Sequence, residues 1–200
     1  MSPDKFRFSE EDILEGGYEY EAKMSAELGM VKGAEYNLEK AEVSENLRER
    51  IMERAYERGI PTKMDISRKF AVSGDVYKME RHLREAEKYS EELGVKIPST
   101  SMKKIRERGY IEAIREDLSE AVEFGRKAIE KEEPRFFGMM HARVMLSNEY
   151  LEKMETDRDL SDLKSSMTMA EEVIHERNYD EGLDLVEWSK NLFEKKLGKY

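Results

Sequence analysis

The chain contains no cysteine and no glutamine in its 200 residues. Without cysteine it can form no disulfide bond, no thiolate metal site and no cysteine nucleophile. The absence of these two labile residue types, together with abundant Glu, Lys and Arg, is typical of proteins from hot environments, where ion-pair networks become less costly. The composition is therefore thermophile-like.

Two hydrophobic patterns are also missing. Sustained alternation of apolar and polar residues, which marks a β-strand, is absent, whereas apolar residues recur at spacings of three and four. The sequence therefore predicts an all-α fold. It has no apolar run of about 18 residues that could span a bilayer, and residues 1–12 hold no apolar segment of signal-peptide length. We expect a cytoplasmic protein without a membrane partner.

Charged residues make up 40% of the chain and hydrophobic residues 38%, and the formal net charge is -10. This balance favours thin helical layers, which bury less of each helix than a thick globule does. An acidic chain is also a poor general binder of nucleic acid, because phosphate contacts need clustered Lys and Arg. Two hundred residues suffice for one substantial domain. We therefore expect a single all-α domain over residues 1–200.

Sparse prolines divide the chain into helical segments. Pro61, Pro98 and Pro134 interrupt the helical pattern at intervals of 37 and 36 residues. The short connections indicate antiparallel neighbours. Within the single domain we expect a long N-terminal helical hairpin over residues 1–60 and a helical array over residues 61–200. Eight helices are expected, or nine if Gly109 breaks one of them: Glu10–Leu28, Met30–Arg58, Met64–Ala71, Asp75–Leu93, Ser101–Glu132, Arg135–Met154, Leu160–Glu176 and Asp180–Leu197.

Residues 65–87 contain two short helical patterns joined at a Gly74-Asp75 turn. The first pattern carries an apolar residue, a small residue and an aromatic residue, and the second carries large and small residues at helical spacing. Small residues let two helices approach closely, and large residues fill the groove beside them. The residues concerned are Ile66, Ser67 and Phe70 before the turn, and Met79, Leu83 and Ala86 after it.

The C-terminal segment repeats this arrangement. Ala170 occupies the place of Ser67, and the two positions are 103 residues apart, within one residue of three periods of about 34 residues. Between them, a helix that Pro134 closes has Ala121 and Ala128 at the small positions. The other matching residues are Met169, Val173, the Arg177-Asn178 turn, Gly182, Val186 and Ser189.

These motifs resemble the tetratricopeptide pattern, in which each unit of about 34 residues is a helical hairpin. The resemblance covers residues 61–200, whereas residues 1–60 fit it poorly and no unit carries the early Trp of the pattern. It implies antiparallel hairpins stacked as a right-handed solenoid. The same spacings also fit an irregular helical bundle, and both architectures predict antiparallel helices packed on one another.

By that resemblance, the chain is expected to be a non-enzymatic scaffold that binds a protein or peptide along a groove formed by successive first helices. The resemblance implies no cofactor. The Lys-and-Asn clamp with which some family members hold a C-terminal carboxylate is not evident, so a mixed apolar and charged groove is expected. Its candidate residues are Met64, Arg68, Ala71, Met167, Glu171 and His175.

The same stretch also fits a helix-turn-helix regulator that binds DNA through residues 63–86. It has a local excess of Lys and Arg, and an apolar and small-residue pattern precedes its tight turn. In this alternative, Lys78, Arg81 and Arg84 lie on the outer face of the second helix and reach phosphates or base edges. Against it, Glu80 stands where that fold buries an apolar side chain.

Other chemistry has little support in the sequence. Glu172-x-x-His175 matches half of a di-metal motif of helical bundles, but the second Glu-x-x-His is missing, and His82 and His141 each stand alone. We therefore expect no metal site. No phosphate-binding loop or nucleophile elbow is present, so we expect no enzymatic activity. Apolar residues that would mark an interface with a partner or a second copy of the chain are Phe136, Phe137 and Trp188.

Overall fold

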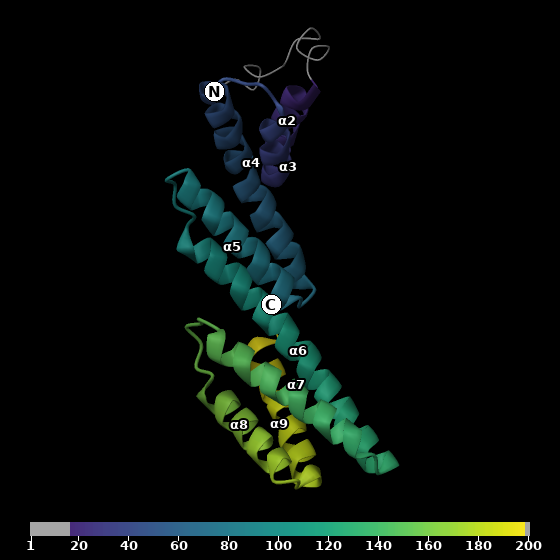
Figure 1. Ribbon diagram of the computed structural model, residues 1–200. Helices are drawn as coiled ribbons and strands as arrows, with labels where there is room; N and C mark the ends of the chain where they lie inside the picture. The colour runs from purple at the N-terminus through teal and green to yellow at the C-terminus, as the bar shows by residue number, and fades with distance from the viewer. Residues whose placement is uncertain (1–16, 199–200) are drawn as a thin grey trace. The chain divides into compact units, whose positions relative to one another are not determined.

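The computed structural model describes residues 17–198, and this part of the chain is helical apart from turns and short connections (Figure 1). It contains no strand, which confirms the expected all-α fold class. None of its helices combines the length and the apolar character that a bilayer-spanning segment needs. Residues 10–16 of the first expected helix lie outside the described residues. The eight described helices are α2 (Gly17–Glu27), α3 (Val31–Lys40), α4 (Glu45–Val72), α5 (Val76–Glu92), α6 (Ser99–Lys131), α7 (Pro134–Lys153), α8 (Ser161–His175) and α9 (Tyr179–Leu197).

The described residues form two compact units, and each is considered by itself. Unit 1 consists of residues 17–67 and 81–98, and unit 2 consists of residues 68–80 and 99–198. The chain therefore passes from one unit to the other within α4, within α5 and before α6. The single-domain organisation expected from the chain length stays a prediction.

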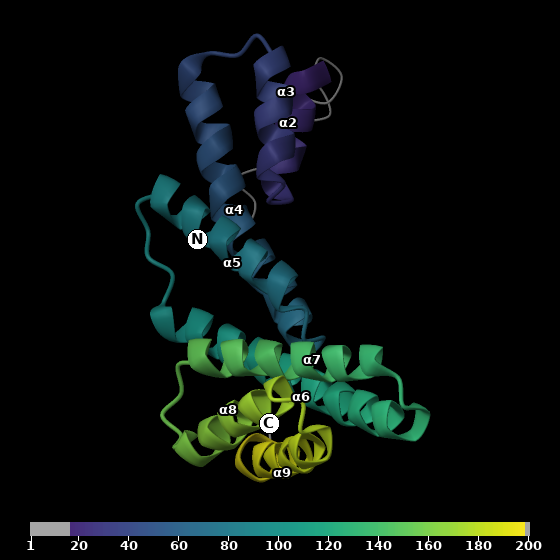
Figure 2. The same cartoon turned by 60° about the horizontal axis from the view of Figure 1, so that its bottom comes forward.

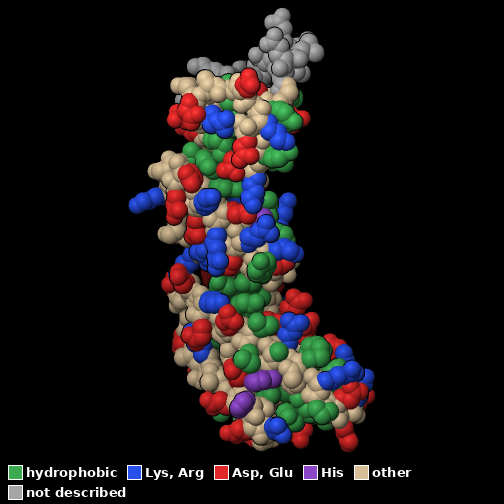
Figure 3. Space-filling view, in the orientation of Figure 1, with side chains coloured by type: hydrophobic (Ala, Val, Ile, Leu, Met, Phe, Trp, Pro, Cys, Tyr) green, Lys and Arg blue, Asp and Glu red, His purple; other side chains and the backbone are tan. Residues whose placement is uncertain are grey.

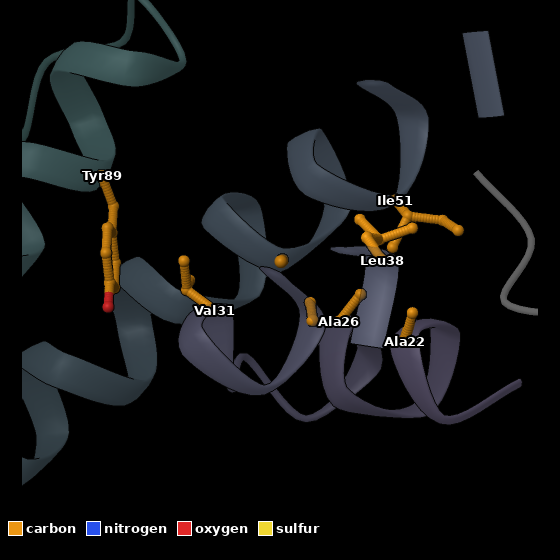
Figure 4. Packing of buried hydrophobic residues seen from close by; sticks show 8 residues of the cluster. Ala22, Ala26, Val31, Leu38, Ile51 and Tyr89 are labelled. Carbon is orange, nitrogen blue, oxygen red and sulfur yellow. The ribbon is translucent and has the colours of Figure 1, made fainter. Parts of the chain in front are cut away.

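Unit 1 is held together by a hydrophobic cluster to which all four of its helices contribute (Figure 4). Ala22 and Ala26 of α2 are at most 2% exposed, and their small side chains let neighbouring helices approach closely. Tyr89 of α5 closes one end of the cluster, where its ring centroid lies 5.5 Å from that of Tyr56. The other buried members are Val31, Ala34, Leu38, Ile51 and Ala55.

The connection between α2 and α3 turns at Gly29, where the sequence predicts a helix end. The φ of Gly29 is +67°, in the left-handed region that glycine adopts without strain. The N–H of Met30 donates to the carbonyl of Ser25 at 2.8 Å and closes α2. A Cβ atom at Gly29 would lie 2.7 Å from the carbonyl oxygen of Arg58. The turn therefore packs directly on α4.

The helix predicted over Met30–Arg58 is wrong, because the structure divides it into α3 and the start of α4. Residues 41–44 between them are not helical. Arg48 in the first turn of α4 donates from Nη2 to the carbonyl of Leu38 at 2.8 Å, across the connection. The change of direction lets the apolar faces of α3 and α4 bury each other, which one continuous helix could not do.

Pro61 does not end a helix, contrary to the prediction that one helix stops at Arg58 and the next begins at Met64. It lies on the exposed side of the continuous helix α4. A proline has no N–H to donate within a helix, and its ring clashes with the preceding turn. The side chains of Ala55 and Met64, on either side of it, are buried. Tertiary packing therefore outweighs the local cost of the proline.

α4 and α5 form an antiparallel hairpin whose turn is centred on Gly74. In unit 1, Lys63 forms an ion pair with Glu85, and a Cβ atom at Gly59 would lie 2.9 Å from the ring of Tyr89. The two members of each pair are equally far from Gly74 in the sequence, as an antiparallel hairpin requires. The φ of Gly74 is +70°. The predicted turn is confirmed, and it needs glycine.

The last four helices of unit 2 form a closed ring of antiparallel neighbours (Figure 2). α6 packs against α7 and α9, and α8 also packs against α7 and α9, whereas α6 and α8 make no comparable contact. These are the neighbour relations of a four-helix bundle. One contact from each interface is Asp117–Arg143 (α6–α7), Arg126–Glu187 (α6–α9), Asn148–Glu171 (α7–α8) and Ser166–Ser189 (α8–α9).

The small residues predicted to lie at helix contacts are buried. Ser67 and Ala170 are both 0% exposed, which confirms that they face the protein interior. A Cβ atom at Gly182 of α9 would lie 2.6 Å from a side chain of α8. Ser189 lies two turns after Gly182 in α9, and its hydroxyl donates to the hydroxyl of Ser166 of α8 at 2.9 Å. The small side chains therefore let helices approach closely, as expected.

α6 is continuous through Gly109, so the break considered at this residue does not occur. Gly109 is buried, and a Cβ atom there would overlap the sulfur of Met79 and lie 3.4 Å from the Cα of Ala71. Both residues belong to the part of the α4–α5 hairpin that is in unit 2. Because it has no side chain, Gly109 leaves room for this part of the hairpin to pack on α6, and it does not interrupt the helix.

Candidate functional site

The six residues predicted to line a binding groove differ in their accessibility. Half of them have buried side chains, which a partner could reach only if the helices separated. Whether any of the six contacts a partner stays a prediction. Met64, Ala71 and Met167 are buried, Glu171 is half-buried, and Arg68 and His175 are exposed.

The structure brings only part of this set together. Met64 belongs to unit 1, whereas the other five residues belong to unit 2. Among those five, Met167, Glu171 and His175 lie on successive turns of α8. Their spacing of four residues keeps them on one side of the helix, and that side faces α7.

A row of side chains on α7 faces these residues of α8. The members on α7 follow one another at spacings of four, four and three, which keeps them on one side of the helix. Hydrogen bonds and ring contacts join the two helices along the row. We call the following residues the α7–α8 strip: Phe137, His141, Met145 and Asn148 of α7, and Glu171 and His175 of α8.

Asn148 joins the two helices at one end of the α7–α8 strip. Its amide nitrogen donates to Oε2 of Glu171 at 2.6 Å and to the main-chain carbonyl of Met167 at 3.3 Å. Both acceptors belong to α8, so one side chain holds two points of that helix. Asn148 and Glu171 are half-buried, which strengthens their hydrogen bond relative to one in open water.

Two pairs of rings occupy the end of the strip next to the α8–α9 turn. The centroids of His141 and His175 are 6.0 Å apart, and Figure 3 shows two histidine side chains side by side over α7 and α8. One turn earlier on α7, Phe137 stacks on Tyr179 of α9 with centroids 3.6 Å apart. Nε2 of His141 is buried and has no hydrogen-bond partner among residues 17–198.

The sequence-based reasoning missed the histidine pair, because His141 and His175 each stand alone in their own helix. The signal that could have found the pair is the antiparallel course of α7 and α8, since His141 precedes the end of α7 at Lys153 by 12 residues and His175 follows the start of α8 at Ser161 by 14. Within the described part of the chain, no group of three or more His, Asp or Glu side chains is arranged to hold a metal ion.

Two methionines of similar exposure lie on different faces of unit 2. Met145 of the α7–α8 strip is 48% exposed, and Met169 of α8 is 51% exposed. Met169 follows Ser166 by three residues, and Ser166 contacts Ser189 of α9. Met169 therefore lies on the α9 side of α8, away from the strip. Of the two, only Met145 extends the row that includes Glu171 and His175.

An ion pair between the buried Asp117 and the partly exposed Arg143 joins α6 to α7 away from the strip. Asp117 is 5% exposed, and Nη1 of Arg143 lies 2.8 Å from its Oδ1. Burial raises the pKa of Asp117 to about 6, although the Arg143 guanidinium acts in the opposite direction. Arg143 also contacts Glu120 at 2.6 Å, and that carboxylate contributes to the rise. The arrangement fastens α6 to α7.

Glu80 is engaged in packing between α5 and α6. It accepts a hydrogen bond from the hydroxyl of Tyr110 at 2.9 Å and forms an ion pair with Arg106 at 3.0 Å. The ring of Tyr110 stacks on that of Tyr150 with centroids 5.8 Å apart. Burial raises the pKa of Tyr110, so its hydroxyl keeps the proton that it donates. The charge of Glu80 is therefore matched by polar partners, Tyr110 and Arg106, within unit 2.

The three residues predicted to contact DNA in the helix-turn-helix alternative are divided between the two units. Lys78, in unit 2, forms an ion pair with Asp75 at 2.8 Å, and this contact lowers the pKa of the Asp75 carboxyl group. Arg81 and Arg84 belong to unit 1, where Arg81 lies 3.5 Å from Glu85 and Arg84 is exposed. Two of the three cations therefore already face carboxylates of their own helix or turn.

No protein-family model, no curated protein and no solved structure matches the chain. The functional interpretation therefore rests on the geometry of the described residues.

Proposed function

We propose that the chain is a non-enzymatic scaffold that binds a peptide or a segment of a partner protein across the α7–α8 strip. The observation that carries this proposal is the open side chain of Met145 beside the half-buried Asn148–Glu171 contact. Apolar surface rimmed by polar groups marks an interaction site, and Met145 stands in one row with the half-buried Phe137 and the polar residues of the strip. Methionine suits such a surface because its flexible, polarizable side chain adapts to a partner.

The strip has the mixed character expected of the groove. Glu171 and His175, two of the predicted groove residues, supply a charged and a polar group, and Met145 supplies apolar surface. A bound segment would pack an apolar side chain on Met145 and place a donor near Glu171. No covalent bond needs to change in such an interaction, so the proposal requires neither a cofactor nor a catalytic residue.

We propose the tetratricopeptide-like relation at the level of single hairpins. Its support is the burial of Ser67 and Ala170, which occupy equivalent places in two hairpins. The contact of α6 with α9, where a stacked array would bring α6 against α8, is a property of a closed bundle. A continuous concave face along successive first helices is therefore no part of the proposal.

The test uses Met145 and its matched control Met169. Peptides are selected from a displayed library on the purified chain, and their affinities are measured for the wild type, Met145→Glu and Met169→Glu. We expect Met145→Glu to weaken binding by about tenfold or more, because a charge replaces an apolar contact. Met169→Glu should bind like the wild type, because its side chain lies on the α9 side of α8.

Both substituted side chains are about half exposed, so both variants should keep the helical content and the melting temperature of the wild type. Circular dichroism checks this requirement. The proposal fails if the selected peptides bind Met145→Glu as tightly as the wild type. It also fails if no peptide binds the wild-type chain.

The helix-turn-helix alternative stays a prediction that no observation favours. A helix-turn-helix joins its two helices at a large angle, whereas α4 and α5 run antiparallel from Gly74 to the Gly59–Tyr89 contact. A shift of duplex DNA at low salt, abolished by charge reversal of Arg81 and Arg84, would support this alternative over peptide binding.

A further inference from the structure

We propose that His141 and His175 together bind one divalent transition-metal ion between α7 and α8. The two imidazole rings come from neighbouring helices, and their centroids are 6.0 Å apart. The pair does not depend on the proposed peptide binding, since metal binding is measured on the chain alone. It is also separate from the Glu172-x-x-His175 motif, because the second ligand comes from α7.

The separation of the rings fits a shared metal ion. With metal–nitrogen bonds of about 2.1 Å, each ring centroid lies about 3.2 Å from the ion, and two rings at a tetrahedral angle have centroids about 5.2 Å apart. The two centroids therefore need to approach by less than about 1 Å. His175 is exposed, so its ring can make this movement by rotation of the side chain.

Neither ring is committed to another partner in the described structure. Nε2 of His141 is buried without a hydrogen-bond partner among residues 17–198, a costly state for a polar atom that a metal ion would relieve. His82 in unit 1 lies beside a carboxylate and not beside a second imidazole, because its Nδ1 is 3.4 Å from a carboxylate oxygen of Glu85. Of these histidines, the pair in unit 2 is the one arranged for a shared ligand.

The donor set indicates which metals the site takes. Imidazole nitrogen binds Zn²⁺, Ni²⁺ and Cu²⁺, whereas Mg²⁺ and Ca²⁺ prefer oxygen ligands. Two imidazoles leave the remaining coordination positions to water. An ion held in this way links α7 to α8 at the end of the strip opposite the Asn148–Glu171 hydrogen bond. It therefore stabilises the folded chain by an amount that grows with the logarithm of the ion concentration above the dissociation constant.

The experiment is a calorimetric titration of the full chain, without an added histidine tag, with Zn²⁺. A large excess of Mg²⁺ is present throughout to occupy the many surface carboxylates. The variants are His141→Ala and His175→Ala, and His82→Ala is the matched control. We expect one Zn²⁺ per chain with micromolar affinity for the wild type and for His82→Ala, and a higher melting temperature when Zn²⁺ is added.

Each substitution in the pair should weaken Zn²⁺ binding by about tenfold or more, because one of two protein ligands is lost. His175 is exposed, so His175→Ala should remain folded and is decisive even if His141→Ala loses stability. The proposal is overturned if the wild type shows no saturable binding of one Zn²⁺. It is equally overturned if His175→Ala binds Zn²⁺ like the wild type, or if His82→Ala loses as much affinity.

Discussion

Asp117 shows how burial changes the chemistry of a single residue. The residue is 5% exposed, and burial raises the pKa of its carboxyl group from 3.8 to about 6 in spite of the nearby Arg143 guanidinium. Between these two pH values the folded chain keeps a proton that the unfolded chain has released. The free energy of unfolding therefore decreases as the pH rises through this window.

We predict that Asp117→Asn gains stability relative to the wild type as the pH is raised from 4 to 7. Asparagine does not titrate, so the variant does not lose unfolding free energy as Asp117 ionises. In the wild type this loss amounts to about 3 kcal/mol at most, for a pKa raised by about two pH units. Urea denaturation of both proteins at several pH values gives the difference. A difference that stays constant or decreases with rising pH would contradict the assigned pKa.

At the scale of the element, α4 contains a proline in its interior. Pro61 removes one main-chain hydrogen bond from the helix, and the hydroxyl of Thr62 donates to the carbonyl of Arg58 at 2.9 Å beside it. Pro134 stands instead at the first turn of α7, where the missing N–H would have had no partner within the helix. The same residue type therefore has different costs in the two helices.

Replacement of Pro61 by Ala should increase the free energy of unfolding by roughly 1–2 kcal/mol. The gain is the restored hydrogen bond and the relieved clash, less the loss of the restriction that proline places on the unfolded chain. Pro134→Ala is the control and should change stability by less than about 0.5 kcal/mol. Denaturant unfolding of both variants tests this, and equal effects would show that Pro61 is not strained.

The same helix shows how far local patterns predict an element. The spacing of apolar residues correctly predicts that the residues on both sides of Pro61 are helical, because the spacing shows which faces are buried. It fails to predict that the two segments form one helix, since the cost of the proline is offset by burial of Ala55 and Met64 in the folded chain. Local patterns also do not decide whether Gly109 breaks α6, because the side chain that packs against Gly109 is Met79 of α5.

At the scale of the whole molecule, neither unit is one continuous segment of the chain. Residues 68–80 of unit 2 stand in the sequence between two segments of unit 1, and α4 and α5 each continue from one unit into the other. A unit that needs both segments cannot complete its own structure while the connecting helices are unfolded. We therefore expect the two units to unfold together.

Calorimetry should show one thermal transition, with equal calorimetric and van't Hoff enthalpies. Gly29→Ala in unit 1 and Gly125→Ala in unit 2 should both lower the temperature of that transition, because each added Cβ atom would lie 2.7 Å from its nearest neighbour. Gly94→Ala, with nothing within 4 Å, should lower it less than Gly29→Ala does. Two transitions, each shifted by one variant alone, would establish two independent domains.

The sequence by itself determined the helical class, the turns at Gly29 and Gly74, and the burial of small residues such as Ala170, because helical spacing and glycine conformation are local properties. Only the tertiary structure decided that His141 lies beside His175 and that Met145 is open while Met167 is buried. These features depend on which helices become neighbours and in what order. That choice is made by the packing of residues far apart in the chain, and no local spacing records it.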